Sequence, residues 1–194
     1  MTRIPAHVAA GRRAPFPAGV FLGELAKVQD SWSDDKTGLA LLLTFTNVTP
    51  FDAESPQVGA RPKTQRIQVI FDNQSLVDVT DFNDDVPLAL QNAATLVTQM
   101  AEALGLVKPN ADGSVDFELE PFLNDLMAGA FNGSALVFEV RHRQWKSKKT
   151  GNSGTDDSIC AFKAAGEATN PGTAEAAAAP VPPTTPTAAL RGRK

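Results

Sequence analysis

The feature that most constrains the fold is a change of hydrophobic period along the chain. Apolar and polar residues alternate in residues 39–48, 64–71 and 134–145, the pattern of strands that place one face on a core. The segment from Pro87 to Gly105 instead has apolar residues at helical spacing, with proline and glycine where a helix begins and ends. The sequence therefore predicts a mainly β protein with an amphipathic helix inserted among its strands.

Three further segments complete the predicted order. Residues 19–30 read as a first strand, with Gly23 at a bend or bulge, and form a hairpin with 39–48; residues 158–163 read as a last strand. A second short helix is expected at 121–131. The order of strand, strand, strand, helix, strand, strand matches the five-stranded OB-fold, a Greek-key barrel with a helix between its third and fourth strands. Element order does not fix strand order, so a barrel-like sandwich is the alternative.

The ends of the chain differ in composition from its centre. Residues 1–16 are predicted to be a flexible arm, and residues 165–194 a disordered tail rich in Ala, Pro and Thr that ends in the basic tip RGRK. The predicted OB-fold-like domain is residues 17–164. A chain of 194 residues has room for one such domain and its tails.

The cellular setting is inferred from what the sequence does not contain. Cys160 is the only cysteine, which excludes an intramolecular disulfide and a zinc site built on several cysteines. No signal-like apolar segment and no run of 18 apolar residues is present. We therefore expect a cytoplasmic protein with no membrane association and no cofactor.

Charge is distributed unevenly. The net charge is −4, but residues 141–149, RHRQWKSKK, hold five of the 18 Lys and Arg and no acid. Such a basic stripe on an acidic body directs an anionic ligand to one place. The alternative is a solvated basic turn with no ligand.

Both tryptophans occur in the same short phrase. Residues 32–38 read WSDDKTG and residues 145–151 read WKSKKTG. In an OB-fold these would be the loops that join strands one to two and four to five, which flank the ligand face. Alternatively, the Lys-Thr-Gly part is ordinary hairpin sequence, with the glycine at positive φ, and each indole is a buried plug.

Together these patterns predict an interface for single-stranded nucleic acid. Cations neutralise phosphates, and bases stack on indole rings regardless of sequence. The second phrase and the arginines before it form the main surface, and the first phrase and the third strand add secondary contacts. The predicted residues are Trp32, Lys36, Arg66, Arg141, Arg143, Trp145, Lys146, Lys148 and Lys149.

Enzymatic alternatives have less support. Asp78, Asp81, Asp84 and Asp85 could bind a metal, but they precede a helix, where carboxylates cap the backbone and meet the helix dipole. His142 falls on the apolar side of its strand and is expected to be a partly buried core residue. No nucleophile elbow, phosphate loop or metal-spaced histidine pair is present, so we predict a non-enzymatic protein without a metal.

Over residues 17–164 the layout of the chain resembles phage-type OB-fold single-stranded DNA-binding proteins. The resemblance lies in the hairpin at Gly19–Asn47, the third strand and the RHRQWKSKKTG hairpin. The resemblance implies a homo-oligomer that protects exposed strands in DNA replication or recombination and works with proteins of those processes. RNA is a possible ligand too. Members of this group commonly end in an acidic tip, whereas this chain has RGRK. The alternative function is a viral structural or assembly protein, with the barrel as scaffold and the arms as subunit contacts.

Overall fold

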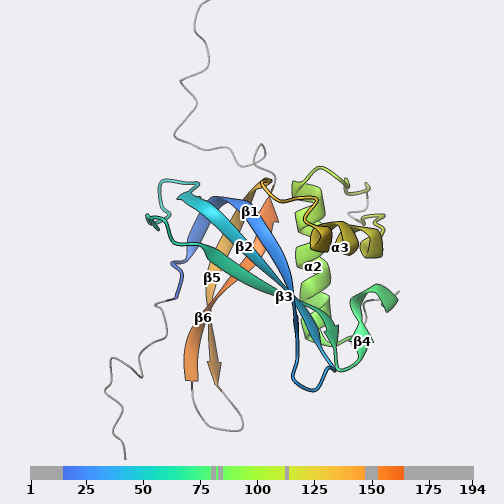
Figure 1. Ribbon diagram of the computed structural model, residues 1–194. Coiled ribbons are helices and arrows are strands. Elements are labelled where there is room, and N and C mark those ends of the chain that lie inside the picture. The colour runs from blue at the N-terminus through green and yellow to red at the C-terminus, as the bar shows by residue number, and fades with distance from the viewer. Residues whose placement is uncertain (1–14, 80–81, 83–84, 112–113, 147–152, 164–194) are drawn as a thin grey trace, which may run out of the picture.

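The structure is a computed structural model that describes residues 15–79, 82, 85–111, 114–146 and 153–163, with the side chains of Trp145 and Lys146 left out (Figure 1). Its centre is one antiparallel sheet of six strands in the order β4-β3-β2-β1-β5-β6. The strands are β1 (Gly19–Trp32), β2 (Leu39–Pro50), β3 (Lys63–Phe71), β4 (Gln74–Ser75), β5 (Ala135–Lys146) and β6 (Ser153–Lys163).

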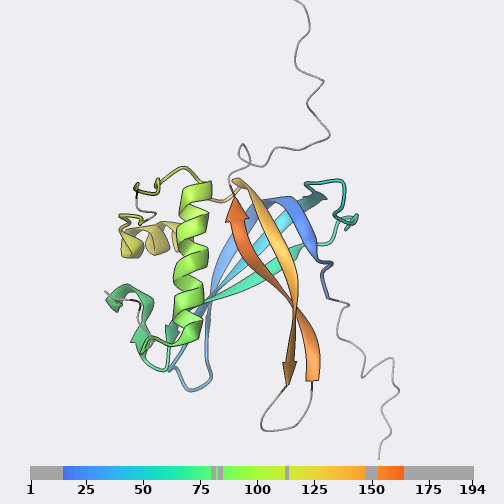
Figure 2. The same ribbon diagram turned by 180° about the vertical axis from the view of Figure 1, so that it is seen from behind.

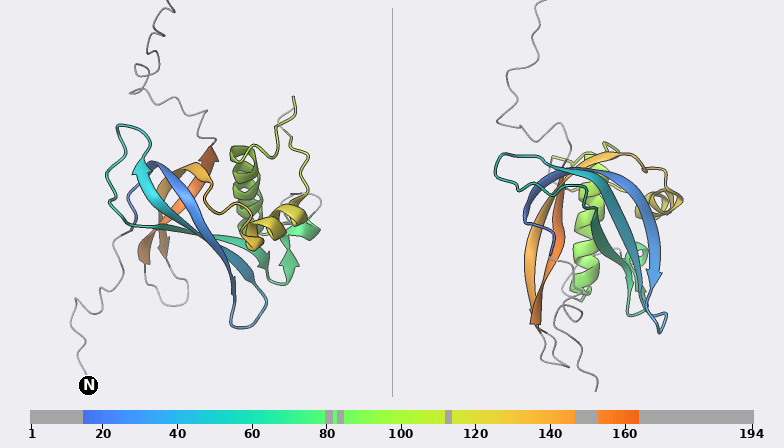
Figure 3. Two further views of the ribbon diagram at one scale, coloured as in Figure 1. Left: turned by 45° about the horizontal axis from the view of Figure 1, so that its top comes forward. Right: turned by 60° about the vertical axis from the view of Figure 1, so that its left-hand side comes forward.

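The sheet curls into an open, roughly barrel-like shape because its central strand bends (Figure 3). β1 pairs with β2 over most of its length and with β5 through its first residues, and its register against β2 shifts on either side of Glu24. Such bulges increase the local twist of a strand. A side chain at Gly23 would come within 3.0 Å of the Phe138 ring, so this glycine allows the core to pack directly on the bend.

Two helices cover one side of the sheet (Figure 2). The chain passes from β4 through a short 3-10 turn (Leu76–Asp78) to α2 (Leu88–Ala103) and α3 (Leu119–Ala128), and then enters β5. α2 packs against both β3 and β6, the two long strands that have no backbone partner along most of one edge. Its buried face includes Leu90, Val97 and Met100, as the helical spacing of the sequence predicts.

The core extends to the residues that precede β1. Phe16 is 1% exposed, and its ring meets that of Phe21 edge-on at a centroid distance of 5.2 Å. Phe138 continues the aromatic cluster to Phe45, with their ring centroids 4.9 Å apart. Phe16 was assigned to the predicted flexible arm, and the structure shows it as part of the core; residues 1–14 of that arm lie outside the described residues.

Two other features differ from the sequence prediction. The sheet has six strands instead of five, because the chain after β3 turns through Asp72 and Asn73, both at positive φ, into the two-residue β4. The last strand begins at Ser153, five residues before the predicted start at 158. None of the described helices is long and apolar enough to cross a membrane.

Candidate nucleic-acid interface

A groove of about 780 Å³ follows the line where β3, α2 and β6 meet. This volume is typical of ligand-binding clefts. Its lining combines apolar and polar surface and includes part of α2 and of β6. The charged side chains in it are Arg66, Arg141, Arg143, Asp156 and Asp157, and the uncharged polar ones that matter here are Asn92, Thr95 and Ser158. Three of the nine predicted site residues, Arg66, Arg141 and Arg143, therefore share one surface although two strands of the sheet separate β3 from β5.

The three arginines are in different electrostatic settings. Arg141 donates from Nε to Oε1 of Glu139 at 2.6 Å, and this hydrogen bond raises its pKa above the ordinary value. Within the described part of the chain, Arg66 and Arg143 form no ion pair. Asp156 lies opposite Arg143 in the β5–β6 register and reduces the local positive charge. Arg66 and Arg143 are therefore the cations most available to an anionic ligand.

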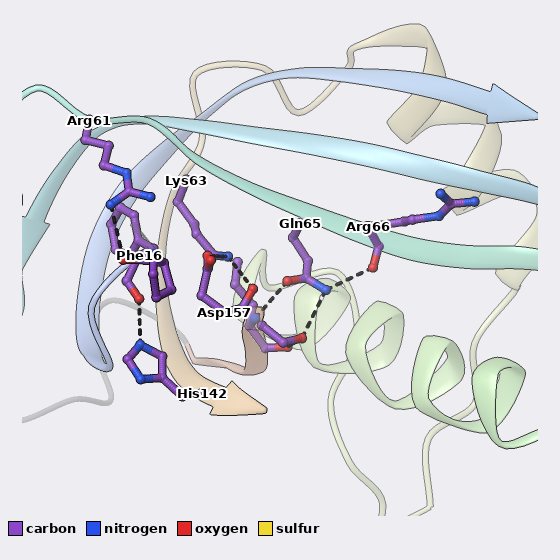
Figure 4. Close-up of polar contacts among 10 residues, drawn as sticks. Phe16, Arg61, Lys63, Gln65, Arg66, His142 and Asp157 are labelled. Atoms are coloured by element: carbon purple, nitrogen blue, oxygen red, sulfur yellow. Dashed lines mark hydrogen bonds and ion pairs between the residues drawn. The ribbon is translucent and has the colours of Figure 1, made fainter. Parts of the chain in front are cut away.

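The floor of the groove is a junction where the sheet is joined by side chains instead of backbone hydrogen bonds (Figure 4). Gln65, on β3, accepts a hydrogen bond from the Ile159 backbone N–H at 2.7 Å and donates to the carbonyl of Arg66 at 2.9 Å. Its Nε2 lies 3.5 Å from Ser158 Oγ. The Gln65 side-chain amide thus provides a hydrogen-bond partner for a backbone group on the free edge of β6. It connects β3 to β6 although the two strands share no backbone hydrogen bonds.

Lys63 makes the second connection across this junction. Its ammonium group is 2% exposed and donates to the Asp157 carboxylate and, at 2.9 Å, to the Asp157 carbonyl. Burial lowers the pKa of Lys63, although the hydrogen bond to Asp157 opposes the shift. Burial alone would raise the pKa of Asp157, but the hydrogen bond and charge of Lys63 outweigh it and lower that pKa. The Asp157 carboxylate is therefore charged at neutral pH, where it can serve as the counterion of the Lys63 ammonium group.

The segment before β1 packs behind the same junction. The Phe16 ring centroid lies 5.9 Å from Lys63 Nζ and 5.4 Å from the Arg61 guanidinium, within the range of cation–π contacts. His142 Nε2 lies 2.9 Å from the Phe16 carbonyl oxygen, and this pair is visible in Figure 4. The prediction of His142 as a partly buried core residue is wrong: its side chain is exposed, because β5 at this point has passed the edge of the core.

The first Trp phrase forms a tight hairpin loop between β1 and β2. Trp32 is 44% exposed, and Lys36 Nζ lies 5.8 Å from its ring centroid, so the indole is not a buried plug. Asp35 accepts hydrogen bonds from the Ser33 hydroxyl at 2.6 Å and the Thr37 hydroxyl at 2.8 Å, and these bonds lower its pKa to about 2. The residue at positive φ is Lys36 (61°), whereas the sequence analysis expected the glycine there.

Gly38 has another role in this hairpin. A Cβ at this position would lie 3.1 Å from Gln68 Nε2 and 3.3 Å from the Ile70 carbonyl oxygen. The glycine therefore allows the loop to lie close to β3. The neighbouring Thr37 carbonyl accepts the Asn73 N–H at 2.8 Å, which joins the loop to the β3–β4 turn as well.

The two predicted hairpins project from the same end of the sheet. The β1–β2 loop, the end of β5 and the start of β6 lie at the lower end in Figures 1 and 2. Trp145 pairs with Gly154 there, one position before the last pair of the β5–β6 ladder. Lys148 and Lys149 lie outside the described residues, as do the side chains of Trp145 and Lys146, so their predicted contacts remain predictions.

Sequence reasoning missed the residues that build the groove floor. Lys63, Gln65 and Asp157 occur in no recognisable motif, although the alternation of β3 did carry a signal. Ile67 and Val69 point inward, so the same period places residues 63 and 65 inward too. A polar residue at a core position of an edge strand indicates a partner across the free edge, because buried polar groups are hydrogen-bonded.

The acidic residues before α2 do not form a metal site in the described part of the chain. Asp78 and Asp85 are described, whereas Asp81 and Asp84 are not. No group of three potential metal ligands occurs among the described side chains.

Comparison with known proteins gives no identification. No protein-family model matches the chain, and no curated protein has significant sequence similarity to it. The function is therefore inferred from the geometry of the groove and the β1–β2 hairpin.

Proposed function

We propose that the protein is a non-enzymatic, sequence-tolerant single-stranded DNA-binding protein that supports replication or recombination of DNA, in a phage or bacterial setting. The observation that supports this most is the convergence of Arg66, Arg141 and Arg143 on one groove. These residues come from opposite sides of the open sheet, so their shared lining is a property of the folded chain. A row of cations on a concave surface is what a phosphate backbone requires.

The strand order is consistent with an OB-fold. Without the two-residue β4, the long strands run β3-β2-β1-β5-β6, and the helices follow the third of them. An OB-fold barrel is partly open and binds oligonucleotides near its second and third strands and the flanking loops. In this assignment the unjoined edge between β3 and β6 is the opening of the barrel, and the arginines border it.

The exposed indole favours a single strand over a duplex. Trp32 presents its ring to solvent, and bases can stack on such a ring only when they are not paired and stacked on one another. Lys36 beside the ring adds a cation near the same nucleotide. The protein would therefore hold phosphates in the groove and a base at the hairpin, with little preference for sequence.

A fluorescence titration with oligo-dT tests this proposal. Three phosphate contacts predict a log–log salt slope of about −2, so affinity should fall about 20-fold between roughly 50 and 200 mM salt. The variant R66A/R141A/R143A should bind much more weakly and lose most of that slope. The matched control K27A/K108A/K163A removes three exposed cations that do not line the groove. It should leave the affinity nearly unchanged, because exposed charges are screened beyond about 10 Å.

Each outcome decides between the alternatives. Absence of both quenching and a mobility shift at low salt would exclude strand binding and favour the assembly protein. Binding that survives the triple arginine substitution would move the site away from the groove. An oligo-U competitor of equal length reports whether RNA competes as well as DNA. Magnesium-dependent cleavage of the oligonucleotide would contradict the non-enzymatic assignment.

A further inference from the structure

A second hollow, of about 460 Å³, lies beside α3. Its floor is aromatic: the Phe122 ring centroid is 5.2 Å from that of Phe117 and 5.3 Å from that of Phe131. Leu106, 51% exposed, extends this apolar surface outward. None of the residues that line the hollow also lines the groove, so the two sites are separate.

The end of α3 builds the hollow. Gly129 adopts a left-handed conformation (φ 80°), and the Ala130 N–H bonds back to the Asp125 carbonyl at 3.0 Å, which terminates the helix. The reversed chain then places Phe131 against Phe122. The turn depends on this glycine because other residues rarely adopt its left-handed φ, and a Cβ there would also meet the Asn132 side chain at 2.7 Å.

The rim of the hollow is acidic. Asp116, Glu118 and Asp125 line it, all exposed, and none of the described Lys or Arg side chains does. Residues 104–134 contain five acids and a single lysine. An aromatic floor inside a ring of carboxylates suits a ligand with one apolar side chain followed by several cations.

We propose that this hollow binds residues 190–194 of the same chain, LRGRK. The segment has one leucine next to three cations within four residues, which matches the aromatic floor and the acidic rim. Leu190 enters the hollow between the phenylalanines, and Arg191, Arg193 and Lys194 meet the carboxylates. The inference does not depend on nucleic-acid binding.

Chain length permits this contact. Leu190 follows Lys163, the end of β6, by 27 positions, which allows a span of up to about 90 Å. β6 also ends on the side of the molecule where the hollow lies. The Phe162 N–H donates to Gln99 of α2 at 3.2 Å, and the chain after α2 leads directly to Leu106 in the lining of the hollow. Figure 1 shows the end of β6 and α3 in the upper half of the molecule. Because the segment belongs to the same chain, its effective concentration at the hollow is in the millimolar range, so weak binding is sufficient.

The basic segment that precedes the described residues fits less well. Arg12 and Arg13 are only a few residues from Phe16, which is held in the core beside Lys63. Three to four residues span at most about 14 Å. In Figure 1 the first described residues, 15–18, lie on the side of the sheet away from α3. It therefore cannot bring its paired arginines to the hollow.

Paramagnetic relaxation in the full-length chain tests the proposal. A spin label at A188C, in a C160S background, should broaden the amide resonances of Leu106, Phe117 and Phe131 several-fold more than those of Asp34 and Asp35. The β1–β2 loop is the control because it is also acidic and lies at the other end of the molecule. Neutralising the rim with D116N/E118Q/D125N should remove the local broadening, and so should high salt.

A charge exchange makes the test specific. Combining D116K/E118K/D125K with R191E/R193E/K194E should restore the broadening, which each triple alone abolishes. Equal broadening at both acidic sites, or broadening that persists after the rim is neutralised, would overturn the proposal. Broadening found only when label and isotope are on different chains would overturn it too, since the segment would then bind a second copy. A failure of this test leaves the oligo-dT titration unaffected, and the reverse also holds.

Discussion

The hollow at α3 and the β3–β6 groove place charge in opposite ways. At α3 the Phe122 ring is buried and the carboxylates stand at the rim, whereas at the groove the Lys63 ammonium is buried behind the lining and the arginines are exposed. The first arrangement gains stability from apolar packing. The second buries an ion pair, which costs stability because charge must be desolvated, and it leaves other cations exposed to a ligand.

The largest effect is expected from the aromatic floor at α3. Phe122→Ala should lower the free energy of unfolding by about 3–5 kcal/mol, because the ring is 4% exposed and contacts two others. Urea unfolding measures the change, which should be the same at acidic and neutral pH since no titrating group is removed. Phe122→Leu is the control and should cost about 1.5 kcal/mol or less. A small effect of the alanine variant would mean that the floor is not packed in solution.

The buried charge at the groove predicts a smaller effect that depends on pH. Asp157→Asn should cost about 3 kcal/mol at neutral pH, because it leaves the Lys63 ammonium buried without its counterion. The pKa of Asp157 is lowered in the fold, so its contribution is complete above the ordinary value of 3.8 and is lost as pH falls through the folded pKa. The difference between wild type and variant should therefore shrink in acid.

A double substitution separates charge from packing at this position. K63M/D157L removes both charges and should be more stable than Asp157→Asn alone, because no unpaired ion remains. If the double variant were the less stable one, the ion pair would contribute net stability, and the contrast between the two hollows would disappear.

The alternation of the sequence was sufficient to predict the long strands and the amphipathic helix. It did not predict the start of β6, since residues 153–157 are small, polar or acidic. They form a strand because they pair in register with β5, with Arg143 opposite Asp156 and His142 opposite Asp157. Strand propensity depends on such neighbours, and a single segment does not show them.

The individual residues of the candidate site could be predicted from the sequence, but the surface that they form together could not. Arg66, Arg141 and Arg143 follow from charge and alternation, but their common groove depends on which sheet edges face each other. That relation follows from the bend at Gly23 and from α2 between the edges. The hollow at α3 was not predicted, because its rings come together only through the turn at Gly129.

Trp32 should affect binding without affecting stability, the reverse of Phe122. Trp32→Ala should weaken oligo-dT binding by about 1 kcal/mol, roughly fivefold, through loss of one stacked base. The melting temperature should hardly change, because the side chain is 44% exposed. Trp32→Phe keeps an aromatic face and should retain most of the affinity. A clear loss of stability in the alanine variant would assign this indole to the fold.

The smallest effect is expected in the hairpin loop that carries this indole. Hydrogen bonds from Ser33 and Thr37 hold the pKa of Asp35 at about 2, although the carboxyl is fully exposed. Because that pKa is depressed, the loop is favoured in full above the ordinary value of 3.8 and loosens only as pH falls through about 2. An NMR titration should show the Asp35 carboxyl and the Thr37 amide changing together near that pH.

The matched variant is Thr37→Val, which removes the hydroxyl donor and should raise the pKa of Asp35 toward 3.8. If the wild-type carboxyl already titrated there, the network would not exist in solution. Asp35 would then be free to attract Lys36 away from the indole. This acidic loop can present the Lys36 cation to a phosphate only while Asp35 is hydrogen-bonded within its own loop. The small shift in the Asp35 pKa tests that condition directly.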